Sequence, residues 1–292
     1  MIHIIVILCI FGGVLSGVTT TTEKTLKVLE QVLISSRNET KSKSQELGGT
    51  TTNATLVHGL NEDPVGTDTI MKERIIRGIP VNELHYPYVV SMYDQKNPLL
   101  CGGTIITSRI ILTAGHCVDT KPTHVRTSIS NKKYKVIKTF THEEFDRDSL
   151  INDIGLLLLN NQIEKATIVP LQEHISPVPL GTRAYALGWG LTEYGSFSRK
   201  LRLIEVPIIP PKICAQNYGL TGYWVCTDSH FLSTCNGDSG GPLMMDGVQI
   251  GITSFGADSC ELGWSSVFTR VSAYYDWIEH KINISEKLEV RS

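Results

Sequence analysis

Short apolar stretches, each bounded by turn-forming residues, recur along the chain from Ile75 onward. β-Branched and aromatic residues dominate these stretches, and Gly, Pro, Asn and Asp separate them. They occupy residues 88–92, 104–106, 110–112, 134–137, 154–159, 248–254 and 266–271. Runs of this length and composition are typical of β-strands, and many such strands predict an all-β barrel or sandwich.

One segment near the C-terminus has helical periodicity instead. Tyr274, Trp277, Ile278 and Ile282 fall on one face when residues 273–284 are placed on a helix. The pattern favours a helix nowhere else in this part of the chain, and it shows no internal repeat. We therefore expect residues 273–284 to form the only helix of the domain.

The first 17 residues are predicted to be a secretory signal peptide. Residues 4–11 are continuously apolar and are followed by small residues up to Gly17. The run is far shorter than the roughly 20 residues that a membrane-spanning helix needs, and cleavage near Ser16 or Gly17 fits it. A buried N-terminal strand or helix is the alternative, but the polar stretch after it offers no core to join. No later apolar run is long enough to span a bilayer, so we expect a secreted protein without membrane association.

Residues 18–74 differ in composition from the C-terminal part of the chain. They contain no cysteine, and Leu47 is the only large apolar residue between Ser35 and Thr55. Such a segment cannot bury enough surface to offset the entropy of ordering it. We interpret 18–74 as a largely disordered propeptide, in which residues 26–33 form at most one short helix. A domain at 75–292 comes after it.

Charge and cysteine content narrow the function classes. The net charge of the 292 residues is -2 at pH 7, which argues against a nucleic-acid-binding protein. Loss of Cys9 with the signal peptide leaves an even number of cysteines, as expected of an oxidised, exported protein. Their pairing stays open at this point; they are Cys101, Cys117, Cys214, Cys226, Cys235 and Cys260. Asn38, Asn53 and Asn283 begin acceptor triplets for N-glycosylation.

The segment 234–242, Thr-Cys-Asn-Gly-Asp-Ser-Gly-Gly-Pro, surrounds one serine with glycines. Glycine lets another group approach the backbone closely. The backbone N–H groups of Gly237 and Ser239 would converge on one point, which suits the oxygen of a tetrahedral intermediate in acyl transfer. A serine hydroxyl attacks a carbonyl only when a base removes its proton, so the chain must supply a histidine and an acid.

His116 and Asp153 are the best candidates for these roles. His116 ends an apolar strand and precedes a cysteine that can fix it. Asp153 enters the apolar run 154–159, so its carboxylate is expected to be partly buried and to need a partner such as an imidazole N–H. His230 stands alone in a loop, and no His/Cys cluster has zinc spacing. We expect no metal and no cofactor.

From Ile75 to about Ile284 the sequence resembles the chymotrypsin/trypsin family of serine endopeptidases. His116, Asp153 and Ser239 occur in the family's order, and the segment around Ser239 matches almost letter for letter. Gly115 and Gly155 stand where the family usually has alanine. The resemblance implies two packed antiparallel six-stranded β-barrels with a C-terminal α-helix.

The resemblance also implies roles for these residues. His116 would be the general base and acid, Asp153 would orient it, and Ser239 would be the nucleophile. The Gly237 and Ser239 amides would form the oxyanion hole. The implied disulfides are Cys101–Cys117, Cys214–Cys226 and Cys235–Cys260.

An activation site is implied at the start of the domain. Cleavage after Arg74 would free the amine of Ile75, which in the family turns inward and pairs with the aspartate before the nucleophile, here Asp238. Arg77 stands where glycine is commoner. The alternative is that Arg74 is an ordinary surface charge.

The resemblance places the specificity pocket at four small residues, with Ser233 as its floor and Ser254, Gly256 and Ser266 in its walls. Trypsin-like members carry an aspartate at the position of Ser233. A buried guanidinium without a counter-charge is costly, so we expect cleavage after uncharged residues, led by Leu, Met, Phe and Tyr. A loop acid that reaches the pocket would restore basic specificity; the candidates are Asp228, Asp258 and Glu261.

The predicted function is that of a secreted, monomeric serine endopeptidase, made as a zymogen and activated by a separate trypsin-like protease. Its partners would be protein or peptide substrates, with no nucleic acid and no membrane. Two alternatives remain: a catalytically inactive homologue that acts as a binding protein, and trypsin-like cleavage after Arg or Lys.

Overall fold

The computed structural model describes residues 78–94, 99–130, 132–174, 177–192, 194–219, 222–230, 232–257, 260 and 264–289. The predicted signal peptide, the propeptide, the Arg74–Ile75 junction, Asn38 and Asn53 lie outside the described residues. Asp258 and Glu261 also lie outside them.

Six antiparallel strands form a first closed barrel, in the order β2-β3-β4-β7-β6-β5. The strands are β2 (Val89–Tyr93), β3 (Cys101–Ile105), β4 (Ile110–Thr113), β5 (His124–Thr127), β6 (Lys133–Thr141) and β7 (Gly155–Leu159). Every residue of β7 is buried, because the apolar run faces the barrel interior on one side and neighbouring elements on the other.

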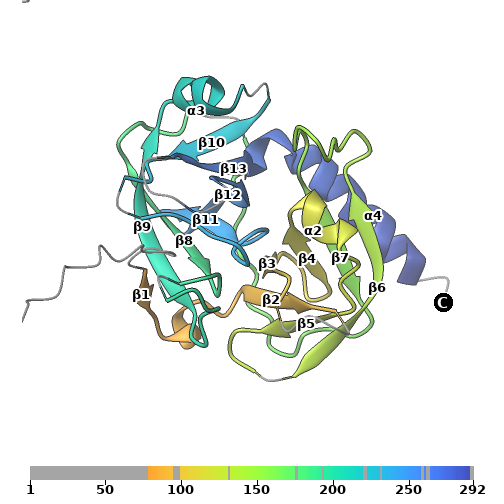
Figure 1. Cartoon of the computed structure of the whole chain (residues 1–292). Helices are drawn as coiled ribbons and strands as arrows, with labels where there is room; N and C mark the ends of the chain where they lie inside the picture. The colour runs from red at the N-terminus through yellow and green to blue at the C-terminus, as the bar shows by residue number, and fades with distance from the viewer. Residues whose placement is uncertain are drawn as a thin grey trace, which may run out of the picture. The chain divides into compact units, whose positions relative to one another are not determined.

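A second barrel of six antiparallel strands has the order β9-β10-β13-β12-β11-β8, and pairing of β8 with β9 closes it. The short strand β1 (Ile79–Pro80) adds to β9. The barrel strands are β8 (Arg183–Gly188), β9 (Arg202–Ile209), β10 (Trp224–Thr227), β11 (Pro242–Met245), β12 (Val248–Phe255) and β13 (Ser266–Arg270). Figure 1 shows the two barrels side by side. The predicted two-barrel fold is therefore confirmed.

The C-terminal helix α4 (Tyr275–Glu289) packs on the first barrel. Ile278 is fully buried in that barrel's core cluster, and Trp277 and Ile282 pack against it, so the predicted apolar face is confirmed. Tyr274 follows the short 3₁₀ helix η2 (Val271–Ala273) and precedes α4. None of the described helices is long and apolar enough to cross a lipid bilayer.

The expectation of a single helix was wrong. The structure adds α2 (Gly115–Asp119) and α3 (Pro211–Tyr218), together with the 3₁₀ helix η1 (Glu83–His85). Pro211 occupies the first turn of α3, and Gly219 caps its end with φ of 68°. These are ordinary start and stop signals, but α3 and α2 are too short to show a 3.6-residue apolar repeat.

Two buried contacts join the barrels near the ends of their strands. Thr104 Oγ1 on β3 donates a hydrogen bond of 2.8 Å to Gln249 Oε1 on β12, and both residues are fully buried. The Gly102 N–H on β3 donates to the Ser239 carbonyl oxygen at 2.7 Å. The second contact ties the loop that carries Ser239 to the barrel that carries His116.

Candidate active site

His116 and Asp153 meet through two hydrogen bonds. The His116 backbone N–H donates to Asp153 Oδ1, and His116 Nδ1 donates to Asp153 Oδ2, both at 2.8 Å. Asp153 has no exposed surface, and the imidazole is 23% exposed. A carboxylate only accepts hydrogen bonds, so this contact places the ring proton on Nδ1 and leaves the Nε2 lone pair available as a base.

Two further hydroxyl groups hold Asp153. Ser254 Oγ donates to Asp153 Oδ2 at 2.5 Å, and Thr269 Oγ1 donates to the Asp153 carbonyl oxygen at 2.8 Å. Both donors come from the second barrel, on β12 and β13, whereas Asp153 lies just before β7 of the first. A buried carboxylate is stable only when its oxygens are satisfied, and here both barrels contribute donors.

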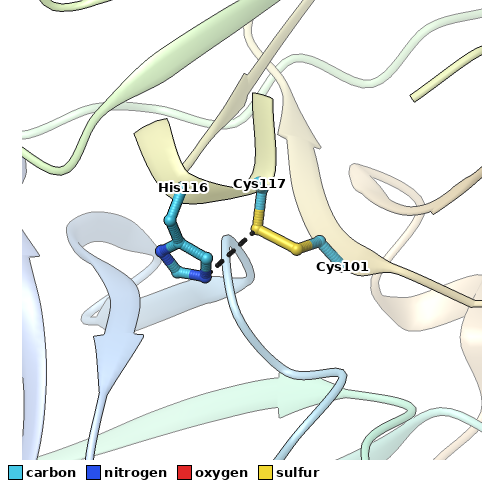
Figure 2. Close-up of side chains that lie close together, drawn as sticks. All are labelled: Cys101, His116 and Cys117. Carbon is cyan, nitrogen blue, oxygen red and sulfur yellow. Dashed lines mark hydrogen bonds between the residues drawn. A yellow bond between two sulfur atoms is a disulfide. The ribbon is translucent and has the colours of Figure 1, made fainter. Parts of the chain in front are cut away.

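A disulfide fixes the helical turn that carries His116. Figure 2 shows Cys101 of β3 bridged to Cys117, the residue after His116 on α2. Cys117 Sγ lies 3.6 Å from His116 Nε2. A disulfide sulfur has no proton to donate, so this is a packing contact beside the Nε2 lone pair. The bridge therefore limits where the imidazole can turn.

The structure accounts for one of the two glycines that stand for alanine. A Cβ on Gly155 would lie 2.5 Å from Val118 Cγ2 and 3.0 Å from the Phe140 carbonyl oxygen. Val118 thus occupies the space that an alanine methyl would need. A Cβ on Gly115 would meet nothing closer than 3.2 Å.

Ser239 lies in a turn with two left-handed glycines, Gly237 (φ 96°) and Gly240 (φ 78°). A Cβ on Gly240 would lie 2.2 Å from Thr113 Oγ1 and 2.5 Å from the Gly102 carbonyl oxygen. Only glycine fits there, and this close approach brings the turn against β3. Within the described part of the chain, no hydrogen bond joins Ser239 Oγ to His116 Nε2; catalytic hydrogen bonds of this kind often tighten only when substrate binds.

Asp238, the residue before Ser239, is buried and only 3% exposed. Its carboxylate accepts hydrogen bonds from the Gly190 N–H at 2.8 Å and the Cys235 N–H at 3.0 Å. Burial raises the pKa of Asp238 to about 7, although these two hydrogen bonds and the charge of Arg202 oppose the rise. The carboxylate borders a small cavity of about 10 Å³, which has room for about one water molecule, lined by Ala186, Leu187, Gly188, Arg202, Ile204, Thr234 and Asp238.

A second cleft, of about 470 Å³ with its open mouth included, adjoins Ser239. It is lined by Thr234, Cys235, Asn236, Ser239, Thr253, Ser254, Phe255, Gly256, Ala257 and Cys260. No charged side chain belongs to this described lining, and the predicted wall residues Ser254 and Gly256 do.

Ser233 and Ser266, the predicted floor and one predicted wall residue, are both buried and are not among the described residues that line this cleft. Thr234, which does line the cleft, connects to them, because its Oγ1 donates to Ser266 Oγ at 3.3 Å. Ser266 Oγ also lies 3.0 Å from Ser229 Oγ and 3.4 Å from Ser233 Oγ. Thr234, Ser229, Ser233 and Ser266 therefore form one network of hydroxyls directly beside the cleft.

The structure forms the three disulfides that the resemblance implied. Asp228 accepts hydrogen bonds from the backbone and ring of His230 and does not line the cleft. The only described group of three potential metal ligands is Cys101, His116 and Cys117; its sulfurs form the disulfide, so they are not thiolates.

Sequence reasoning missed two residues at the site besides Thr234. Phe197 lies over Gly237, since a Cβ there would be 2.8 Å from Phe197 Cε1. Arg202 borders the Asp238 cavity. Both lie in segments with no pattern of their own, and only the folded chain brings them to the site.

Two closed antiparallel barrels, with a buried aspartate, a histidine and a serine between them, define a chymotrypsin-like hydrolase. The sequence matches the trypsin family over residues 75–278. The chain therefore belongs to the trypsin family of serine endopeptidases.

Individual relatives agree with this assignment. The chain is 34% identical over 218 residues to Chymotrypsin-2 of Vespa crabro, covering 70% of this chain and 98% of the relative. It is 33% identical over 226 residues to Brachyurin of Leptuca pugilator, covering 72% and 100%. Among solved structures, human heparin binding protein matches with a TM-score of 0.62 and 27% identity, over 71% of this chain and 96% of that one.

Proposed function

We propose that this chain is a secreted serine endopeptidase that cleaves after uncharged residues, using Ser239 as nucleophile, His116 as base and acid, and Asp153 to orient the imidazole. The contact between Asp153 and His116 Nδ1 carries the proposal. In the neutral imidazole it keeps the ring proton on Nδ1 and the lone pair on Nε2, and that lone pair is what a serine hydroxyl needs in order to lose its proton.

The reaction proceeds in two stages. Ser239 Oγ forms a bond to the substrate carbonyl carbon while His116 Nε2 takes the hydroxyl proton. The Gly237 and Ser239 amides stabilise the oxyanion. The tetrahedral intermediate then expels the amine, which receives the proton from His116, and leaves an acyl-enzyme. Water, activated by the same Nε2, hydrolyses the ester and restores Ser239.

We further propose that residues 1–17 are a signal peptide, that 18–74 are a propeptide and that cleavage after Arg74 activates the domain at 75–292. The raised pKa of Asp238 supports the last of these proposals, the activation by cleavage. Burial disfavours the ionised form of this carboxyl group, and a cation beside it would stabilise that form. The Ile75 amine would be this cation and would enter the cavity beside Asp238. The new pair would hold the turn of Gly237 and Ser239 in its active form. A separate trypsin-like protease would make the cut, and the mature enzyme would act as a monomer.

The substrate preference follows from the neutral lining of the cleft beside Ser239. The described lining holds hydroxyls and no carboxylate, which disfavours Arg and Lys and accepts Leu, Met, Phe or Tyr. The names Chymotrypsin-2 and Brachyurin agree with a hydrolytic role.

Labelling with a fluorophosphonate tests the nucleophile. The chain cleaved after Arg74 should react at Ser239, and Ser239→Ala should not react. A folded, cleaved chain that neither labels nor turns over peptides would instead be an inactive homologue that acts by binding.

Matched peptide substrates test the specificity. They should differ only in the residue before the scissile bond, with Phe, Leu and Arg compared by kcat/KM. Faster cleavage of the Arg peptide would overturn the proposed preference and indicate trypsin-like specificity.

A further inference from the structure

One segment of the first barrel carries a concentrated positive charge. Residues 120–141 contain no Asp or Glu, although the whole chain has more acidic than basic residues. The same segment contains seven Lys, Arg and His side chains on β5, β6 and their flanks: Lys121, His124, Arg126, Lys132, Lys133, Lys135 and Lys138. We call Arg126, Lys133, Lys135 and Lys138 the cationic face.

The strand register places like charges opposite one another. Arg126 on β5 pairs directly with Lys133 on β6. Next to them, Val125 and Tyr134 point into the barrel and are buried. Like charges in directly opposed positions destabilise a sheet, so this register places an unfavourable pair on the solvent side.

None of the ion pairs in the described part of the chain involves the cationic face. Lys132, which is not part of the face, pairs with Glu164. The repulsion is therefore relieved mainly by solvent and salt, and an anionic ligand would relieve it further.

An aromatic ring holds part of the face in place. Arg126 lies 5.3 Å and Lys133 lies 6.0 Å from the centroid of the Tyr93 ring on β2. The Tyr93 hydroxyl is in turn 2.8 Å from Ser91 Oγ, which is buried. Cation–π contacts orient both cations beside one ring, so a ligand would meet an ordered pair of charges.

The fold determines what kind of ligand can bind here. β5 and β6 are both paired on each side within the closed barrel, so neither offers a free edge to which a peptide strand could add. The cationic face therefore offers side-chain charges but no free backbone N–H or C=O groups. Such a surface favours a polymer that is recognised through its own dense negative charge.

We propose that the cationic face binds a sulfated polysaccharide. Such polymers are the dense polyanions of extracellular spaces, so the choice of this ligand rests on the proposed secretion of the protein. Binding of the polymer does not depend on the proposed catalytic activity. Binding would hold the peptidase at a sulfated matrix while leaving the cleft beside Ser239 open.

The test compares dextran sulfate with neutral dextran of the same length, using the full chain with Ser239→Ala to prevent autolysis. Dextran sulfate should bind and dextran should not, and the affinity should fall as salt is raised. Lys133→Gln combined with Lys135→Gln should weaken binding about tenfold. The melting temperature should stay unchanged or rise, because the substitutions remove the opposed charges.

A matched control removes two charges elsewhere. Lys212→Gln on α3 combined with Lys287→Gln on α4 gives the same net charge and should leave affinity within about twofold. An equal loss in this control, or no binding at low salt, would overturn the proposal. If polyglutamate displaces dextran sulfate at equal charge concentration, the face binds acidic polypeptides instead. Wild-type protein that binds but hydrolyses nothing would count against the proposed function alone.

Discussion

At the scale of single residues, the buried Asp153 is the group on which the site's protonation pattern depends. It accepts hydrogen bonds from His116 and from Ser254. Asp153→Asn would preserve the shape of the side chain and remove its charge. The new amide N–H would either face the Nδ1–H of His116 or force the imidazole into the other tautomer. In a serine protease with the same three residue types, replacing the aspartate by asparagine lowers kcat about 10⁴-fold.

We expect Asp153→Asn to lower kcat by a similar factor, with KM little changed. Ser254→Ala is the matched control, because it removes one donor but keeps the charge; its effect should be far smaller. Steady-state kinetics on a Phe or Leu peptide measures both. Near-normal turnover in Asp153→Asn would mean that another group sets the tautomer.

Asp238 makes stability depend on pH. Burial raises its pKa from 3.8 to about 7, so between these values the folded chain holds a proton that the unfolded chain has released. The free energy of unfolding of the uncleaved precursor should fall as pH rises from about 4 to about 7 and then level off, by on the order of 4 kcal/mol.

Denaturant unfolding at several pH values measures this dependence. Asp238→Asn should remove that part of the slope, and cleavage after Arg74 should remove or reverse it, because an amine partner favours the charged carboxylate. A slope equal in the precursor and in Asp238→Asn would assign the pH dependence to other groups.

At the scale of elements, the long apolar run of β7 could be predicted from the sequence, whereas β8 and β9 could not. The β7 strand was visible because all five of its residues are apolar or glycine. The sequence did not predict β8 or β9, since their patterns of buried and exposed residues mix with charged positions such as Arg183 and Glu205. Five-residue α2 is below the length at which helical periodicity can be detected.

The packing of α2 on β7 yields a prediction about Gly155. Gly155→Ala should destabilise the protein by about 1–3 kcal/mol, because its methyl group would overlap Val118 Cγ2. Val118→Ala should relieve part of this loss. The double variant should therefore lose about 1 kcal/mol less free energy of unfolding than the two single variants lose together.

Thermal and denaturant unfolding of the four proteins in this cycle gives the coupling energy. Gly115→Ala is a useful comparison, since its methyl would meet nothing closer than 3.2 Å. Additive effects of the two substitutions would show that Val118 does not occupy the missing methyl's place.

At the scale of the whole molecule, the site exists only where two barrels meet. The sequence identified His116, Asp153 and Ser239 through short segments with distinctive chemistry. It could not identify the Thr104–Gln249 contact, whose partners are 145 residues apart, or the hydroxyl network that joins Thr234 to Ser229, Ser233 and Ser266. Such features depend on how complete barrels pack, and a single residue's chemistry does not signal them.

The neutral cleft and the proposed activation site together imply that the protein cannot activate itself efficiently. Cleavage after Arg74 requires an enzyme that binds a guanidinium, whereas the described lining beside Ser239 holds hydroxyls and no carboxylate. Purified precursor should therefore remain intact on incubation, and added trypsin should generate a chain beginning at Ile75 together with peptidase activity. N-terminal sequencing and peptide turnover follow the two events separately.

Ser239→Ala precursor should be cut by trypsin at the same rate but stay inactive. Rapid cleavage of wild-type precursor alone, absent in Ser239→Ala, would mean that the cleft accepts arginine and that the substrate preference inferred from it is wrong.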